Sequence, residues 1–173
     1  MDHKILVTYS SRTGWTTGVA EAIGKTLVEN GDQVDVLPMR DVKDLSMYDA
    51  VVAGSAIRNK TWLPEAVQFI RAHQKELQAK PFAVFLVCMT LAMPSGENYR
   101  PHISTWLDPV RALVHPVSTG LFAGGLDIGK IESFRDRLMF RVSVLFDVWK
   151  EGDHRNWAAI KEWAVQLKPL LAK

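Results

Sequence analysis

The sequence predicts an α/β protein in which helices cover both faces of a doubly wound, five-stranded parallel sheet. Short, continuously apolar and β-branched segments recur along the chain, as expected of strands that are buried on both faces. Segments with apolar residues at every third or fourth position separate them, so strand and helix alternate and right-handed crossovers are expected. The length of 173 residues suits one domain over residues 1–173.

Five segments fit the strand pattern. The first, Lys4 to Tyr9, leads directly into a turn rich in hydroxyl groups. The fourth is the longest apolar run and is expected at the centre of the sheet. The predicted strands cover residues 4–9, 33–37, 49–54, 81–89 and 117–123.

Four helices are predicted between and after the strands. The first follows the hydroxyl-rich turn and stops at Asn30-Gly31, and Pro64 opens the second. The second, third and fourth helices are predicted over residues 64–78, 102–114 and 157–171.

Residues 127–153 form an extra segment between the fifth strand and the last helix. Its apolar residues recur at steps of three and four, which predicts an amphipathic helix over about residues 131–150. Arg135, Arg137 and Arg141 flank the apolar stripe. Two interpretations stay open: a helix packed on the sheet edge, or a docking surface for a membrane or a redox partner.

Composition excludes several classes of protein. A formal charge of +2 and an apolar fraction of 47% are ordinary for a globular protein. A single cysteine, Cys88, allows no intrachain disulfide, and this favours a location in the cytoplasm. Neither a signal peptide nor a membrane-spanning segment is expected. Peripheral contact with a membrane stays open. His102 and His115 lack a ligand three or four residues away, so no metal site is predicted, and no basic-aromatic pattern indicates nucleic-acid binding.

The turn after the first strand has the composition of a phosphate-binding loop. Strand-turn-helix geometry points backbone N–H groups and a helix N-terminus at one place. The turn lacks the glycine spacing of dinucleotide sites and the Gly-Lys of triphosphate loops, and its hydroxyl groups favour a terminal phosphate monoester. The candidate residues are Ser10, Ser11, Arg12, Thr13, Gly14, Trp15 and Thr16.

Two further loops are expected at the same edge of the sheet. One, Gly54 to Trp62, offers an apolar wall and Asn59 as a hydrogen-bonding group. The other, Cys88 to Asn98, follows the fourth strand and is unusually long. Because ligands of such sheets bind outside the carboxyl ends of the strands, the three loops predict a slot for a flat aromatic ring beside a phosphate anchor.

These motifs carry a family resemblance. Tyr9 to Thr16 resembles the T/S-x-T-G-x-T phosphate loop of flavodoxins, which implies the strand order 2-1-3-4-5. Together with Gly54-Ser-Ala-Ile-Arg58, the long loop and the extra segment, it is similar to the flavodoxin-like protoporphyrinogen oxidases that pass electrons to menaquinone. The resemblance implies FMN, with its phosphate on residues 10–16 and its isoalloxazine ring near Ser55, Ala56, Ile57, Arg58, Asn59, Trp62, Met89, Thr90 and Leu91.

The first functional hypothesis is therefore an FMN-dependent oxidoreductase, such as a quinone-linked protoporphyrinogen IX dehydrogenase of heme biosynthesis. The alternatives are a non-catalytic electron carrier that docks on a redox partner, and a flavin-free scaffold. The slightly basic charge argues against a generic, acidic carrier. No catalytic acid or base is predicted.

Three residues have two interpretations each. Arg58 either pairs with a substrate carboxylate or with charge at flavin N1, or is a solvated loop residue. Trp62 either stacks on the flavin or packs at the start of the next helix, and Cys88 is either a small hydrophobic residue or a reactive thiol.

Overall fold

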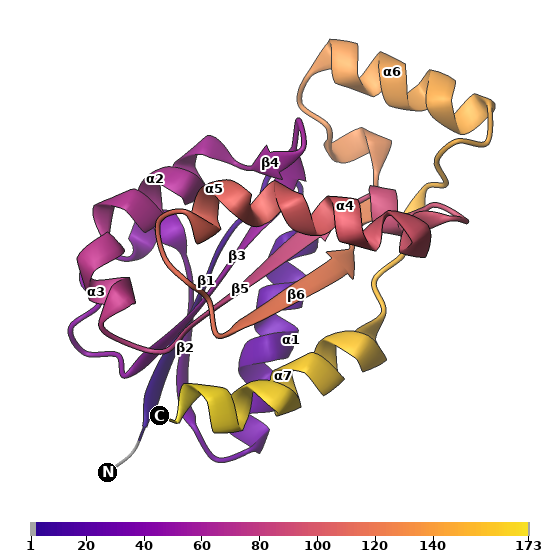
Figure 1. Cartoon of the computed structure of the whole chain (residues 1–173). Helices are drawn as coiled ribbons and strands as arrows, with labels where there is room; N and C mark the ends of the chain where they lie inside the picture. The colour runs from indigo at the N-terminus through magenta and orange to yellow at the C-terminus, as the bar shows by residue number, and fades with distance from the viewer. Residues whose placement is uncertain (1–2, 173) are drawn as a thin grey trace.

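Five parallel strands form the central sheet of the computed structural model, which describes residues 3–172 (Figure 1). Their order is β2-β1-β3-β5-β6, which confirms both the predicted class and the predicted order. That residues 1–173 form one domain stays a prediction, and three of these residues lie outside the described range. The strands are β1 (Lys4–Ser10), β2 (Gln33–Pro38), β3 (Ala50–Arg58), β5 (Phe82–Cys88) and β6 (Ser118–Ala123).

Both faces of the sheet are covered, which explains why the central strands β1, β3 and β5 are mainly apolar, whereas the edge strand β2 has no buried residue. On one face, Ile5 and Val7 of β1 belong to the core formed with α1 (Trp15–Glu29) and α7 (Trp157–Leu171). On the other face, Leu6 packs with α2 (Pro64–Ala72), α3 (Gln74–Gln78), α4 (Arg100–Ser104) and α5 (Asp108–Arg111). All seven residues of β5 are buried.

Two predicted helices are interrupted. The helix predicted over 64–78 breaks at His73, whose ring packs on Phe69 and hydrogen-bonds Glu76. The helix predicted over 102–114 consists of α4, a 3₁₀ turn η4 (Thr105–Leu107) and α5. Pro109, the second residue of α5, has no N–H to continue the helical hydrogen bonds.

The prediction that β3 ends at Gly54 and is followed by a loop is wrong. β3 continues to Arg58, turns through Asn59 and Lys60, and pairs antiparallel with β4 (Thr61–Trp62). Both turn residues have a positive φ, 52° and 59°, as a two-residue hairpin turn of this hand requires. A rigid hairpin therefore replaces the predicted loop.

The extra segment begins and ends on a short ladder. β7 (Gly125–Leu126) pairs antiparallel with β8 (Gly152–Asp153), and η5 (Ile128–Lys130) leads to α6 (Phe134–Leu145). The helix is shorter than predicted because Asp147, at φ 56°, turns the chain away. None of its residues is buried, and Figure 1 shows it clear of the layers, so packing on the sheet edge is the wrong interpretation.

Candidate functional site

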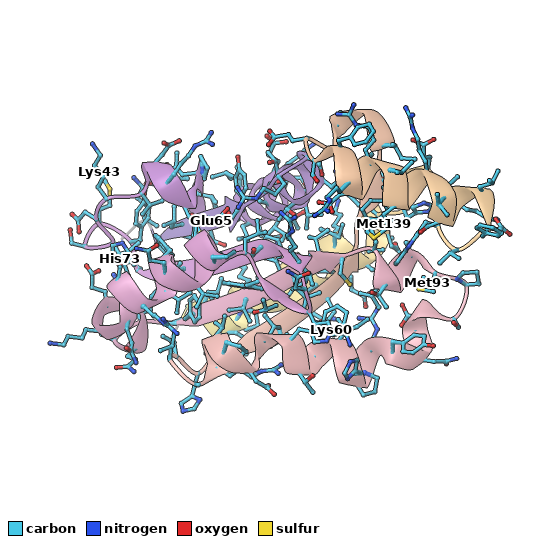
Figure 2. The ribbon with its side chains drawn as sticks, turned by 90° about the horizontal axis from the view of Figure 1, so that it is seen from above. Lys43, Lys60, Glu65, His73, Met93 and Met139 are labelled. Atoms are coloured by element: carbon cyan, nitrogen blue, oxygen red, sulfur yellow. The ribbon has the colours of Figure 1, made fainter. Side chains whose placement is uncertain are left out.

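The three candidate segments meet at the carboxyl ends of β1, β3 and β5. The chain leaves β1 toward β2 on one side and later returns to β3 on the other side, so the strand order reverses between β1 and β3. Ligands of doubly wound sheets bind in the crevice outside such a reversal. Figure 2 looks onto the molecule from above, with Lys60 at the hairpin turn, Met93 after β5 and Met139 of α6 labelled.

The segment 11–14 presents the uncapped N-terminus of α1. Gly14 is the N-cap residue, in the left-handed conformation at φ 87°, and no side chain caps the helix. The Ser11 hydroxyl accepts a hydrogen bond from the Gly14 N–H, 3.0 Å away, which closes the turn. The first N–H groups of a 15-residue helix are thus free to bind an anion. Ser10 and Thr16, at the two ends of the segment, are buried.

Glu65 lies at this segment, which the sequence did not indicate. Its carboxylate accepts a hydrogen bond from the Ser10 hydroxyl, with Oγ 3.1 Å from Oε1. Arg12 Nη2 lies 3.0 Å from both oxygens of the same carboxylate. Two donors expected at a phosphate therefore bind Glu65, from the first turn of α2, in this structure.

Trp15 joins this segment to the base of the insertion. A Cβ on Gly125 would lie 2.5 Å from the indole, so the ring lies directly against β7. Arg155 stacks on the same ring at 4.7 Å and on Trp157 at 4.3 Å, and its Nη1 donates to the Trp15 carbonyl oxygen. Asp153 binds the other side of Arg155 through two hydrogen bonds of 2.8 Å. A contact between Trp15 and a phosphate stays a prediction.

The hairpin after β3 is fastened at its base by Ser55. This fully buried hydroxyl donates to the Ala56 carbonyl oxygen and accepts a hydrogen bond from the Leu63 N–H. Trp62 is only 1% exposed and belongs to the core on the α2 side. The structure therefore supports the packing role of Trp62, and its stacking on a flavin stays a prediction.

Arg58, at the end of β3, reaches the insertion. Its Nη2 lies 3.0 Å from Asp136 Oδ2 on α6, and its side chain is 59% exposed. The guanidinium is therefore paired across the two segments, but one side of it is open to solvent. Asn59, in the turn, is exposed.

The segment after β5 is folded into two 3₁₀ turns, η2 (Thr90–Ala92) and η3 (Gly96–Tyr99). Gly96 allows their close approach, because a Cβ there would lie 2.6 Å from two carbonyl oxygens of η2. Arg100 binds Glu97 through two hydrogen bonds and the Leu121 carbonyl oxygen of β6 through a third. The Arg100 hydrogen bonds hold the pKa of Glu97 below its ordinary value.

Met89, Thr90 and Leu91 thus stand on a braced segment, with Leu91 buried and the other two half-buried. Cys88, beside them, is buried, and this burial raises the pKa of its thiol to about 11. A neutral thiol is a poor nucleophile, which favours the hydrophobic interpretation of Cys88.

Residues 3–172 contain no group of histidine, cysteine, aspartate and glutamate side chains arranged to hold a metal ion. Over the same residues, no helix has both the length and the apolar character needed to cross a membrane.

The sequence model of the flavodoxin domain matches residues 6–150, and the chain belongs to this family. It is 24% identical to protoporphyrinogen IX dehydrogenase [quinone] of Escherichia coli K12, over 98% of this chain and 97% of that one. It is 26% identical to the protein of the same name from Leishmania major, over 93% of this chain and 73% of that one.

Solved structures share the fold at low sequence identity. An archaeal flavodoxin matches 98% of this chain and 99% of its own with a TM-score of 0.57 and 18% identity. Flavodoxin 2 of Bacillus cereus matches 96% of this chain and 98% of its own, with the same TM-score and identity.

Membership of the family makes FMN the cofactor of this chain. The residues present fit FMN: the α1 N-terminus is uncapped, the space beside Gly14 is open, and hydroxyl side chains stand at both ends of the turn. That residues 10–16 hold the phosphate, and residues of the hairpin and of η2 the ring, stays a prediction.

Proposed function

We propose that the chain is an FMN-dependent enzyme that oxidises protoporphyrinogen IX and reduces a quinone. The observation that carries this proposal is the extent of the match to the quinone-linked dehydrogenases. It covers 97–98% of both chains and so includes the insertion that brings Asp136 to Arg58. The identity of 24% supports the class of reaction more strongly than the particular substrate.

The residues at the site have distinct parts in this proposal. Bound FMN supplies the redox chemistry, accepting electrons from the substrate and passing them to the acceptor. The α1 N-terminus and the hydroxyl groups hold the phosphate, and the hairpin and η2 fix the ring. Arg58 orients a carboxylate of the substrate, because a guanidinium binds a planar acid through two parallel hydrogen bonds.

The test is oxidation of protoporphyrinogen IX under anaerobic conditions with FMN and a soluble naphthoquinone. Porphyrin fluorescence should rise only when protein, FMN and quinone are all present. A flavin that is reduced and reoxidised by a reductase, without any porphyrin formed, would instead support the electron-carrier function.

We further propose that α6 contacts an anionic membrane surface, where a lipid-soluble quinone would be met. Its apolar side chains face solvent, with Phe134 75%, Leu138 54% and Leu145 82% exposed. Among the described residues, Arg135 and Arg141 have no acidic partner, whereas Asp136 is paired with Arg58. An exposed apolar face bordered by free arginines is the pattern of an interfacial helix.

This surface is tested by sedimentation with vesicles. The chain should bind vesicles that contain phosphatidylglycerol and lose that binding on Leu138→Glu with Leu145→Glu. Val165→Glu, at a 46% exposed position of α7, is the matched control. Equal binding by both variants, or no binding by the original chain, would exclude α6 as the contact.

A further inference from the structure

The Glu65 carboxylate lies where the phosphate-binding segment needs its donors. Ser10 has one hydroxyl hydrogen, and in this structure it is donated to Glu65. Arg12 is the one cationic side chain of residues 10–16, and its Nη2 is shared between the two Glu65 oxygens. A phosphate at this turn therefore meets an anion that already holds two of the expected donors.

Glu65 is held in this place by the fold and not by Arg12 alone. Pro64 fixes the first position of α2, and the helix N-terminus favours a carboxylate in the first turn. Ser10 is the last residue of β1 and is buried. Because both residues stand on regular elements, the backbones of Ser10 and Glu65 are held next to each other, within reach of this hydrogen bond.

We propose that Glu65 sets the affinity of this site for the phosphate of FMN, by opposing it. A phosphate monoester carries close to two negative charges, and a second anion beside it is unfavourable. Arg12 reduces this repulsion because its guanidinium has five donors and can bind the phosphate and Glu65 together. Glu65 therefore weakens FMN binding, Arg12 restores part of it, and riboflavin, which has no phosphate, is affected by neither.

Three variants test this inference, which rests on the assignment of residues 10–16 to the FMN phosphate. Glu65→Gln keeps the shape and removes the charge, and it should tighten FMN by about tenfold, as expected for loss of one nearby like charge at partial exposure. Arg12→Ala leaves Glu65 unopposed and should weaken FMN by about tenfold. The double variant should return to within about threefold of the original chain, because the two opposite changes cancel when they add.

The measurement is titration of the flavin-free protein with FMN and, separately, with riboflavin, followed by flavin fluorescence. Glu162→Gln, an exposed carboxylate on α7, is the control for a change in net charge. Thermal unfolding of each flavin-free variant checks that the fold is kept.

Glu65→Gln that leaves FMN affinity unchanged or weakens it would overturn the role of Glu65, and so would an equal change for riboflavin. The underlying assignment fails in a different way: substitution of Thr13 or Thr16 would then weaken FMN and riboflavin equally. The two failures are therefore distinguishable.

Discussion

At the scale of single residues, the predicted phosphate site at the turn after β1 depends on side chains that can donate to an anion. The hydroxyl groups of Thr13 and Thr16 have no hydrogen-bonding partner among the described residues, and Thr16 is only 1% exposed. Their hydroxyl groups are thus free to bind a phosphate, in contrast to the Ser10 hydroxyl, which binds Glu65.

Thr13→Ala or Thr16→Ala should weaken FMN by about tenfold, because a hydrogen bond to a charged group contributes roughly 1.5–3 kcal/mol. Riboflavin should lose little affinity to either variant. Equilibrium titration with both flavins gives the ratio, and equal losses would contradict the phosphate assignment.

The residues that the sequence could not reveal at this site are Glu65 and Arg155. An acidic residue after Pro64 is ordinary at a helix start, so nothing local indicates its contact with Arg12, 53 positions earlier. Arg155 contacts Trp15 over 140 positions. Local patterns predict an anion site at Ser10 to Thr16 because strand, turn and helix are consecutive there, but contacts between distant segments leave no periodic signal.

At the scale of secondary-structure elements, the hairpin β3–β4 carries strain in its turn. Lys60 adopts φ 59°, where a side chain at Cβ crowds the backbone and glycine does not. The usual second residue of such a turn is glycine. The turn sequence Asn59-Lys60 lacks this glycine, so it did not indicate a hairpin. In addition, Ser55 and Arg58 differ from the apolar residues of the rest of β3, so the strand was not predicted to continue.

Lys60→Gly should stabilise the protein by about 1 kcal/mol, because it removes the crowding at a positive φ. For a chain of this size, that corresponds to a rise of about 2–4 °C in Tm. Lys43→Gly, at an exposed lysine with an ordinary φ, is the control and should destabilise slightly. Equal loss of stability by both variants would show that the turn is not strained.

α6 shows a different limit of sequence patterns. Its apolar period predicts a helix with one apolar face; the structure confirms the helix over Phe134–Leu145, with apolar residues on more than one side of it. A period cannot tell whether that face packs on its own chain or meets another surface. In contrast, α7 was predicted with its observed bounds, because its apolar residues pack on the sheet and Asn156 caps its start.

At the scale of the whole molecule, two buried groups, Tyr48 and Cys88, make the free energy of unfolding depend on pH in the alkaline range. Tyr48 donates to Asp35, 2.8 Å away, and burial above all raises the pKa of Tyr48 from 10.0 to about 12. Burial likewise raises the pKa of Cys88 from 9.0 to about 11. The unfolded chain thus loses these protons at a lower pH than the folded chain does, so the stability is complete below pH 9 and decreases from there to about pH 12.

Tyr48→Phe should make the free energy of unfolding less dependent on pH between 10 and 12. Denaturant unfolding at several pH values measures the slope, with Tyr99→Phe, at an exposed tyrosine, as the control. A slope unchanged by Tyr48→Phe would show that this hydroxyl does not couple ionisation to folding.

FMN should stabilise the whole fold, because the three segments predicted to surround it follow β1, β3 and β5. A ligand that binds only the folded state adds about 2.7 kcal/mol at a hundredfold excess over its Kd. Thermal unfolding with and without FMN measures the shift. A purified protein that is colourless and gains no stability from FMN would support the flavin-free scaffold.

The fold as a whole was predictable because the central strands β1, β3 and β5 are largely buried and mainly apolar, and segments with a helical period separate the strands. The placing of the insertion was not, since it depends on single contacts such as Arg58 with Asp136. Arg58 and Asp136 are 78 positions apart in the sequence, so their contact forms only when the fold brings the two segments together.

The ladder that closes the insertion makes it a removable part. Leu126 and Gly152 are direct partners across β7 and β8, so the extra segment begins and ends at the same place, on a two-stranded ladder separate from the central sheet. Paired residues on antiparallel strands lie about 5 Å apart, a distance that a two-residue turn spans. A chain in which two turn residues replace residues 127–151 would therefore close here as a hairpin without disturbing the central sheet. The extra segment could thus be exchanged as one unit, without change to the segments at the carboxyl ends of β1, β3 and β5.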